Sequence, residues 1–443
     1  MLYDLPAAMQ QHEMPQWPKG VGGIPARLPD GTSVDLPVLQ GVNVLTFGVV
    51  GTGKTKSVTL PAAESLLKAD PRMLGVFFEI KRSFIDYFME QNDKVIAHDP
   101  HVVPDKNLFK PNLIMEIRQA QNAEAEMMDL AEFLFSNLLE DANQNRAWVE
   151  GARDTFIGVL RVIVYCYPKE NTTNRTLVNA MRRMSTRELL AYLAQHPRNH
   201  SLLKKEWGYD PDHPDAYRPD RRAKDLSFFL NKALERFSGA FELDGEDTLQ
   251  SWLAGKYGRN LFFLYDLDEA ESSRPFFCYY LKKLKSYKMS NHGASPTRPI
   301  LMVMDEVDKM SEGGKAADWG LYQAANLGRE AGLQILLTTQ SLENLYGLAP
   351  DFNSHMTLGG LAGFPYMICF RPGDPATITS LQTLYGSEYK RHVTRPASRY
   401  GEPMVKADWM PIVSDADFAS LETGSCIVKV LSHRPQIVYI NHP

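Results

Sequence analysis

One octapeptide limits what this chain can fold into more than any other part of its sequence. Residues 48–55 read Gly-Val-Val-Gly-Thr-Gly-Lys-Thr, which fits the pattern G-x-x-x-x-G-K-[ST]. A β-branched and aromatic run, 42–48, precedes this segment, and a stretch of helical character, 55–67, follows it. A strand, a glycine-rich turn and a helix in this order form a P-loop, in which backbone N–H groups and a helix N-terminus bind phosphate.

The residue types of the octapeptide fit a nucleoside triphosphate with its metal ion. We expect Lys54 to reach the β- and γ-phosphates and the Thr55 hydroxyl to bind Mg²⁺. The predicted cofactors are therefore ATP and Mg²⁺. The residues predicted to bind nucleotide are Gly48, Gly51, Thr52, Gly53, Lys54 and Thr55. The alternative is a glycine-rich turn that fits the pattern by chance, and the flanking strand and helix disfavour it.

A second motif, which is acidic, offers a ligand for the metal ion and a base for the attacking water. The strongly apolar run 300–304 predicts a buried strand, and Asp305 and Glu306 follow it directly. A carboxylate at the carboxyl end of such a strand can bind Mg²⁺ through its water shell, which we predict for Asp305. Glu306 is then placed to orient or deprotonate the attacking water. The alternative is an acidic pair that opens a surface loop.

Two further polar residues are candidates with open alternatives. Gln340 ends the apolar run 333–339, so its amide can contact the γ-phosphate or the lytic water; strands also commonly end on polar residues. Arg329 precedes that run, and its guanidinium can stabilise transition-state charge on the nucleotide of a neighbouring subunit. A solvated arginine at a helix end is the alternative reading of Arg329.

The rest of the chain predicts an α/β protein with a helical insertion. Apolar runs at 74–80, 94–98 and 260–265 predict further strands of a parallel sheet, whereas 120–167 has helical spacing. Pro61 predicts a kink or a late start in the helix after the P-loop. The predicted parts are an irregular N-terminal lead-in at 1–40, the first part of a nucleotide-binding domain at 41–114, an all-α inserted domain at 115–250 and the second part of the nucleotide-binding domain at 251–443.

Composition narrows the class of protein. Hydrophobic residues make up 44% and charged residues 23% of the 443 residues, as in soluble globular proteins. The formal net charge of −5 excludes a uniformly basic nucleic-acid binder, and no apolar run approaches the ~18 residues of a membrane span. The four cysteines are scattered, which favours a reducing cytoplasmic location.

The order of the motifs resembles a known family. A P-loop, a long helical stretch and the pair Asp305-Glu306 are followed by 328–342, Gly-Arg-Glu-Ala-Gly-Leu-Gln-Ile-Leu-Leu-Thr-Thr-Gln-Ser-Leu. This series resembles the TraD/TraG-type coupling proteins of conjugative type IV secretion systems, which are relatives of the FtsK and HerA motors. Further stretches that resemble the family are 78–84, 148–153, 356–374, 415–418 and 423–424.

The resemblance implies a fold, a function and partners. It implies an α/β fold with a RecA-like P-loop core, a mainly parallel sheet and an inserted all-α domain. It assigns the Walker B roles to Asp305 and Glu306, the sensor role to Gln340 and the arginine finger to Arg329. Family members form hexameric rings around DNA and use ATP to deliver a relaxase–DNA complex or protein cargo to the secretion channel. Expected partners are therefore DNA, relaxase and inner-membrane components of the secretion system.

Three departures from the family leave its implications open. Coupling proteins usually begin with a membrane anchor, so here the anchor is expected to be missing or to be a separate subunit, unless the protein is a soluble relative. Glu79 stands where the family has Asp. The acidic net charge contrasts with DNA handling, although 282–288 and 390–399 are locally basic. The alternative functions are an ATP-regulated cargo-recruitment platform and a double-stranded DNA motor of FtsK/HerA type outside secretion.

Overall fold

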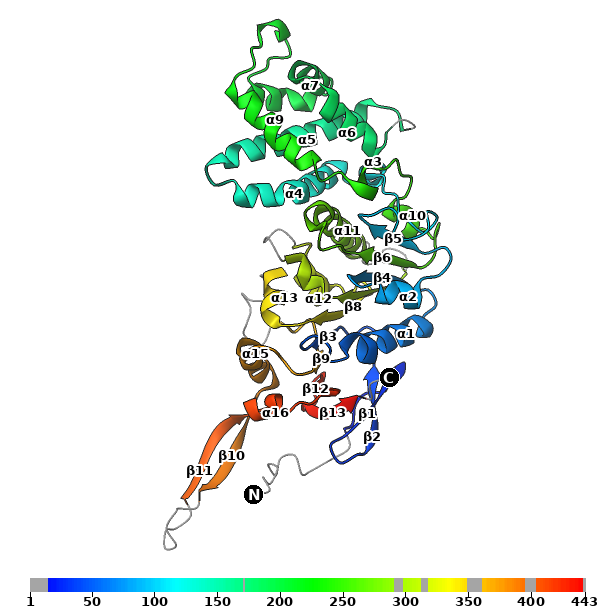
Figure 1. Ribbon diagram of the computed structural model, residues 1–443, viewed down its shortest axis with the longest axis vertical. Coiled ribbons are helices and arrows are strands. Elements are labelled where there is room, and N and C mark those ends of the chain that lie inside the picture. The colour runs from blue at the N-terminus through cyan, green and yellow to red at the C-terminus, as the bar shows by residue number, and fades with distance from the viewer. Residues whose placement is uncertain are drawn as a thin grey trace. The chain divides into compact units, whose positions relative to one another are not determined.

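The computed structural model describes residues 15–169, 172–290, 298–311, 318–348, 361–394 and 404–440. The chain forms two compact units, whose elements are labelled in Figure 1. The first, here called the P-loop unit, consists of 1–73, 292–307 and 322–443. The second, here called the helical unit, consists of 74–291 and 308–321.

The P-loop unit is built on a sheet whose strand order is β2-β1-β13-β12-β9-β3-β8-β7. Strands β9, β3, β8 and β7 are parallel, and the pairs on the other side are antiparallel. Every residue of β3 and β8 is buried. This explains their nearly continuous apolar sequences, because a parallel sheet that is covered on both faces needs apolar side chains on both sides of each strand. The strands are β1 (Gly22–Arg27), β2 (Ser33–Val38), β3 (Val44–Phe47), β7 (Ile300–Asp305), β8 (Leu333–Thr339), β9 (Tyr366–Cys369), β12 (Ser425–Val430) and β13 (Gln436–Ile440).

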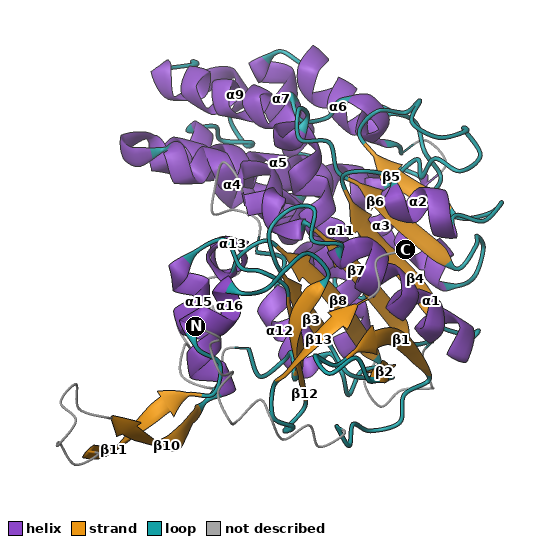
Figure 2. Ribbon diagram, turned by 60° about the horizontal axis from the view of Figure 1, so that its bottom comes forward, coloured by secondary structure: helices purple, strands orange, loops and turns teal. Residues whose placement is uncertain are grey.

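Helices and a separate ribbon complete the P-loop unit. Strands β10 and β11 pair only with each other over their whole length in the described structure (Figure 2). Lys390 and Arg391, two of the basic residues considered for DNA contact, lie in β10, whereas Arg395 and Arg399 lie outside the described residues. The remaining elements are α1 (Leu60–Ala69), α12 (Leu321–Leu327), α13 (Leu342–Leu348), α15 (Pro375–Tyr385), β10 (Ser387–Thr394), β11 (Met404–Pro411) and α16 (Asp415–Ala419).

The first forty residues are not irregular throughout, as the sequence had suggested. They contain β1 and β2, which pair in an antiparallel hairpin from Gly22↔Val38 to Arg27↔Ser33. Strand β2 lies at the edge of the sheet, and β13 pairs with β1 only from Ala26 onwards. Pro25 in β1 and Pro37 in β2 therefore occupy positions at or next to the sheet edge, where a missing backbone N–H is tolerated.

The helix after the P-loop changes type next to Pro61, for which the sequence predicted a kink or a late start. Residues Lys54–Thr59 form one π-helical segment, and α1 begins only at Leu60, which places Pro61 in its first turn. Because the Leu60 N–H still donates to the Thr55 carbonyl, the helix is continuous here, and Pro61, which has no N–H to donate, lies at the change from π-helical to α-helical geometry.

The helical unit combines a small parallel sheet with a long run of helices. Strand β6 lies between β4 and β5, and both pairs are parallel. This confirms, with the sheet of the P-loop unit, the α/β class with a mainly parallel sheet. The strands are β4 (Leu74–Glu79), β5 (Lys94–Ala97) and β6 (Asn260–Leu264). The principal helices are α2 (Ser83–Phe88), α3 (Leu113–Gln119), α4 (Ala123–Asp141), α5 (Arg146–Cys166), α6 (Asn174–Arg183), α7 (Thr186–Leu193), α9 (Arg221–Leu234), α10 (Leu249–Leu253) and α11 (Ala270–Ser290).

Helix α5 is the centre of the helical segment between β5 and β6. It packs against α4 on one side and α9 on the other (Figure 1). Phe156 of α5 contacts the rings of Phe135 and Phe237, with ring centroids 6.0 and 6.4 Å away. The apolar face recurs at the helical spacing seen in the sequence, because Phe156, Val159 and Ile163 are all fully buried.

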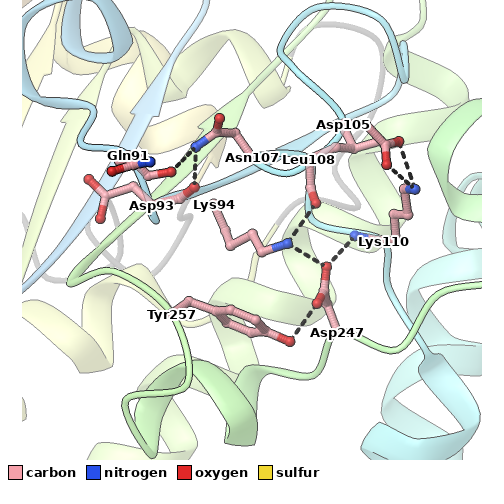
Figure 3. Close-up of polar contacts among 9 residues, drawn as sticks. All are labelled: Gln91, Asp93, Lys94, Asp105, Asn107, Leu108, Lys110, Asp247 and Tyr257. Carbon is pink, nitrogen blue, oxygen red and sulfur yellow. Dashed lines mark hydrogen bonds and ion pairs between the residues drawn. The ribbon is translucent and has the colours of Figure 1, made fainter.

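Asp247 fastens the two ends of this helical segment to β5 (Figure 3). Its carboxylate accepts hydrogen bonds from Lys94 Nζ (3.2 Å), the Lys110 backbone N–H (2.8 Å) and the Tyr257 hydroxyl (2.5 Å). The Asp247 backbone N–H donates to the Lys110 carbonyl, and Pro111 forms a bridge with Asp247. We call this group the Asp247 junction. The domain boundaries at 114/115 and 250/251 stay predictions.

The lysines of α11 hold helices together. Lys282 Nζ lies 2.8 Å from Asp129, and Lys283 Nζ lies 2.7 Å from Glu126 and 3.4 Å from Glu116. Burial lowers the pKa of Lys288, whose side chain is almost completely covered. Lys282 and Lys283 therefore link α11 to α3 and α4, and their charges are compensated by these carboxylates.

Glu116 gives the helical unit a defined pH dependence. Burial raises the pKa of this fully buried carboxyl from 4.5 to about 7, against the opposing effect of Lys283. The folded chain therefore binds a proton that the unfolded chain has lost, so the free energy of unfolding falls by about 3 kcal/mol as the pH rises from 4.5 to about 7. Glu116→Gln keeps an oxygen to accept the Leu249 N–H and carries no charge, and its stability is expected to lack this decline.

Urea unfolding of both proteins from about pH 5 to about pH 8 measures the difference. Because all other groups titrate in both proteins, only the difference between them is used. Glu116→Gln is expected to gain stability relative to the unsubstituted chain as the pH rises. A difference that stays constant over the range would contradict the assignment.

Candidate nucleotide-binding site

The direction of three adjacent strands brings the candidate residues to one edge of the sheet. In the P-loop unit, β3 pairs with β8 and β8 pairs with β7, all in parallel. Phe47 lies opposite Thr339, and Asp305 lies opposite Thr338. The P-loop, Gln340 and the pair Asp305-Glu306 therefore follow the carboxyl ends of neighbouring strands, where ligands of α/β sheets bind.

The P-loop has the backbone that its glycines permit. Gly53 adopts φ 89° and ψ 4° immediately before Lys54, a left-handed conformation that suits glycine. At Gly48 a Cβ atom would lie 2.7 Å from Cβ of Phe370, so the loop approaches the segment after β9 too closely for a side chain. The Val49 N–H donates to the Arg371 carbonyl (3.1 Å), which holds the loop from the same side.

Lys54 is buried with its ammonium turned into the loop. Its Nζ donates to the carbonyl oxygens of Gly48 and Val49, the latter at 2.9 Å. Thr52 also turns inward, because its hydroxyl donates to the Val49 carbonyl at 2.9 Å. The ammonium of Lys54 is therefore held at the P-loop by backbone carbonyls. Charged phosphate oxygens are stronger acceptors for an ammonium than carbonyl oxygens, so a bound phosphate would take the place of these contacts.

The predicted Mg²⁺ ligands meet across the sheet edge. The Thr55 hydroxyl donates to Oδ2 of Asp305 at 2.8 Å, although the two residues are 250 positions apart. The Thr55 hydroxyl is a hard oxygen ligand of the kind that Mg²⁺ prefers, and Mg²⁺ keeps several water molecules when it binds to proteins. The Asp305 carboxylate, next to that hydroxyl, is placed to accept hydrogen bonds from such water molecules, so the pair fits the ion.

Glu306 has a strained backbone directly after the strand. Its φ is 52°, in the left-handed region that a residue with a side chain rarely adopts. Its N–H donates to the Thr338 carbonyl at 3.2 Å, which extends the pairing of β7 and β8 by one residue. Strain of this kind persists where the surroundings over-determine it, and it collects at functional sites.

Comparing Glu306→Gly with Glu306→Ala separates the backbone from the carboxylate. Both variants lose the carboxylate, and both are expected to lose hydrolysis. Glycine accepts φ 52° without a steric penalty, so Glu306→Gly is expected to be more stable than Glu306→Ala by about 1 kcal/mol. Urea unfolding gives the difference in stability and a phosphate-release assay gives the turnover. Equal stability of the two variants would show that the conformation carries no strain.

Gln340 and one residue that the sequence analysis missed lie on either side of the P-loop. Gln340 follows β8, the neighbour of β3 on one side, and Arg371 follows shortly after β9, the neighbour on the other. The Arg371 side chain is exposed. The rule that identified Asp305, a charged residue just beyond the carboxyl end of a buried strand, would also have identified Arg371 after the apolar run 367–370.

Arg329 lies at the opposite edge of the sheet from the P-loop. It belongs to the turn between α12 and β8, and its side chain is exposed. Strand β8 has seven residues, so its amino end lies about 20 Å from its carboxyl end. An arginine side chain does not span that distance. Arg329 therefore does not join the P-loop, Asp305 and Glu306 within one chain.

Glu79, which replaces the aspartate expected from the resemblance, has a structural contact. Its buried carboxylate accepts hydrogen bonds from the backbone N–H groups of Phe84 (2.7 Å) and Ile85 (2.8 Å). These are donors of the first turn of α2, which has no side-chain cap from Arg82. A glutamate here reaches the helix start and stabilises it by its charge.

Comparisons with solved structures place the fold. The bacterial conjugative coupling protein TrwBdeltaN70, in its unbound form, matches with a TM-score of 0.69 and 16% identity over 98% of this chain and 91% of that chain. TrwB in complex with ADP and Mg²⁺ matches with a TM-score of 0.65 and 16% identity, over 98% of this chain and 92% of that one. VirB4 of Thermoanaerobacter pseudethanolicus matches with a TM-score of 0.57 and 12% identity, over 96% and 98% of the two chains.

The likeness to TrwB and VirB4 extends along nearly the whole chain and establishes a shared fold. It agrees with the fold that the motif order implied. No family model and no curated protein matches the sequence. Among the described helices, none has the length and apolar character that crossing a bilayer requires.

Proposed function

We propose that this protein hydrolyses ATP with Mg²⁺ at the P-loop. The observation that carries the proposal is the Thr55–Asp305 contact of 2.8 Å, which joins the two predicted Mg²⁺ ligands beside a P-loop whose lysine is already in place. Bound Mg²⁺ would neutralise charge on the β- and γ-phosphates. TrwB, which shares the fold, has been solved with ADP and Mg²⁺, which supports the choice of cofactors.

Each residue predicted for the site at this edge of the sheet has a role in the proposal. The P-loop N–H groups and Lys54 bind the phosphates, and Thr55 and Asp305 hold the metal ion. Glu306 orients the attacking water and accepts its proton. Gln340, at the end of the neighbouring strand, contacts the γ-phosphate or that water. These roles all belong to one edge of the P-loop unit.

The proposed site is shared between two subunits. Charge that develops on the transferred phosphoryl group is stabilised by an arginine in many P-loop enzymes. Because Arg329 lies at the far edge of its own sheet, it can reach only the nucleotide of another copy. A closed ring, of six chains in our proposal, would repeat this contact at every interface.

We propose further that hydrolysis drives movement of DNA, as part of a coupling protein that delivers a relaxase–DNA complex or protein cargo to a type IV secretion channel. The support is the fold shared with the conjugative coupling protein TrwB over 98% of the chain, together with the order of the motifs. In this proposal the protein works in the cytoplasm at the inner face of the membrane, through a partner or an anchor.

Titration of ATPase activity with DNA tests the motor directly. Single-stranded and double-stranded DNA are added separately at low and moderate salt, with the mass of the assembly measured in parallel. Because phosphate contacts make DNA binding steeply salt-dependent, stimulation is expected to weaken as salt rises. An oligomer whose ATPase ignores DNA at every salt concentration would contradict the motor, and tight binding of a protein cargo would then favour the recruitment platform.

A further inference from the structure

The ribbon formed by β10 and β11 exposes a pair of aromatic rings. Tyr389 and Trp409 are register partners across the two strands, and their ring centroids lie 5.6 Å apart in an edge-to-face arrangement. The exposed fraction is 57% for Tyr389 and 72% for Trp409, which is the most exposed large hydrophobic residue of the described structure. A cross-strand aromatic pair stabilises a ribbon, but these two rings also leave much of their surface available to a ligand.

Charged residues stand next to the rings along both strands. Glu388 and Lys390 flank Tyr389, and Asp408 precedes Trp409. A protein partner that covered the rings would have to bury these charges with them, and the cores of protein interfaces are depleted in charged residues. The surroundings of the pair therefore disfavour a protein as the molecule that covers it.

The ribbon has an excess of positive charge, although the chain as a whole has a net charge of −5. The lysines and arginines of β10 and β11 outnumber the carboxylates, with Lys390, Arg391 and Lys406 against Glu388 and Asp408. One carboxylate is already compensated, because Nη2 of Arg434 lies 2.7 Å from Oε2 of Glu388. Arg391 belongs to the same face of the ribbon as Tyr389, about 7 Å further along β10.

Open aromatic rings beside positive charge fit one class of ligand better than others. Every nucleic-acid base has a flat face that can stack on an aromatic ring, and the backbone phosphates are attracted by nearby cations. In a duplex the base faces are already stacked on one another, so only unpaired bases can use the rings. The residues of the ribbon thus favour single-stranded nucleic acid.

We propose that the Tyr389–Trp409 pair is a stacking surface for the unpaired bases of single-stranded nucleic acid, whose phosphates contact the basic residues of the same ribbon. This assigns a place and a strand form to the DNA contact proposed above, and it rests on that proposal for the expectation that the chain binds DNA. It does not rest on the P-loop or on hydrolysis, because stacking needs no nucleoside triphosphate.

The fluorescence of Trp409 reads the contact directly. The full chain is titrated, without ATP, with an oligothymidylate of about 12 nucleotides, a length that one stacking platform can engage. Stacking on the indole is expected to quench its emission until the site is saturated. An abasic oligonucleotide and a duplex of the same length should leave the emission unchanged. The other five tryptophans are buried or half-buried, namely Trp17, Trp148, Trp207, Trp252 and Trp319.

Substitution by leucine removes the aromatic ring and keeps a large apolar side chain. Trp409→Leu is expected to raise the Kd for a labelled oligothymidylate about tenfold or more, as measured by fluorescence anisotropy. The salt dependence of binding should not change, because no phosphate contact is lost. Tyr389→Leu is the second variant, with the same expected direction, and it decides if Trp409→Leu does not fold. The control is Tyr87→Leu, which removes a similarly exposed tyrosine from α2 and should bind like the unsubstituted chain.

Three results would overturn the inference. The first is that both leucine variants of the ribbon bind oligothymidylate as tightly as the unsubstituted chain. The second is that the abasic oligonucleotide quenches Trp409 as strongly as oligothymidylate does. The third is that raising the protein concentration alone shields Trp409 from acrylamide, which would show that a second copy of the chain covers the ribbon.

Failure of this inference can be distinguished from failure of the proposed motor. DNA that stimulates the ATPase equally in the unsubstituted chain and in both leucine variants contradicts the ribbon contact and leaves the motor in place. Quenching of Trp409 by oligothymidylate in a chain whose ATPase ignores DNA contradicts the motor and supports the ribbon contact. A chain that binds no oligonucleotide at any salt concentration contradicts both.

Discussion

Replacing Lys54 with alanine is expected to lower the rate of ATP hydrolysis by at least about 100-fold, because the ammonium that we propose binds the β- and γ-phosphates is lost. The matched control is Lys56→Ala, two residues further along the same helical segment, where the side chain is exposed. Lys56→Ala should keep the activity of the unsubstituted protein. Release of phosphate from ATP measures both variants, and binding of a fluorescent ATP analogue shows whether Lys54→Ala still holds nucleotide.

The outcome that would contradict this prediction is equally specific. If Lys54→Ala and Lys56→Ala hydrolyse ATP at similar rates, the P-loop is not the site of hydrolysis. The proposals on Thr55, Asp305 and Glu306 would fall with it, because all three are defined by their place beside this loop.

Arg329→Ala is expected to retain ATP binding and to lose turnover by about 10³-fold or more, the range measured for arginine fingers. The reason is topological: the residue precedes β8 while the P-loop follows β3 at the other edge of the sheet, so nucleotide contacts within the chain are untouched. Arg27→Ala, which removes another exposed arginine of the P-loop unit, is the control and should leave both binding and turnover unchanged.

Mixing two inactive variants tests whether the site is shared. A ring that contains Lys54→Ala and Arg329→Ala chains has some interfaces with an intact P-loop on one side and an intact Arg329 on the other. Such mixtures are expected to recover part of the ATPase activity. If mixed rings form, as mass measurement would show, and no activity returns, Arg329 does not act across the interface.

The strands that could be predicted are those whose sequences are nearly continuous apolar runs. The runs at 74–80, 300–304 and 333–339 consist of residues that only a covered sheet accommodates, and they became β4, β7 and β8. The β1–β2 hairpin was missed because its prolines and glycines resemble a loop, and only its position at the sheet edge makes them acceptable. The sequence of a strand does not directly show that the strand lies at the edge of its sheet.

The sequence predicted which types of residue form the candidate site, but it did not predict how they are arranged in space. Residue types at strand ends identified Lys54, Asp305 and Gln340, and strand order then placed them beside one another. That Arg329 lies at the far edge follows from the direction of β8, which the sequence analysis did not use. The lysines of α11 show the converse: four positive charges on one helix suggested a ligand surface, but two of them, Lys282 and Lys283, have partners on α3 and α4, far away in the sequence.

The Asp247 junction has a consequence for how such a chain can change over time. The segment of helices that follows β5 begins after Lys110 and ends before Asp247, and these two residues are hydrogen-bonded to each other through their backbones. The helices between them therefore form a closed loop. Lengthening a closed loop costs little conformational entropy, and the hydrogen bonds of the Asp247 junction are made by residues at the two ends of the loop. Changes of length within 113–246 that leave the contacts of α3 and α4 with α11 in place are therefore expected to keep the register of β5 and β6.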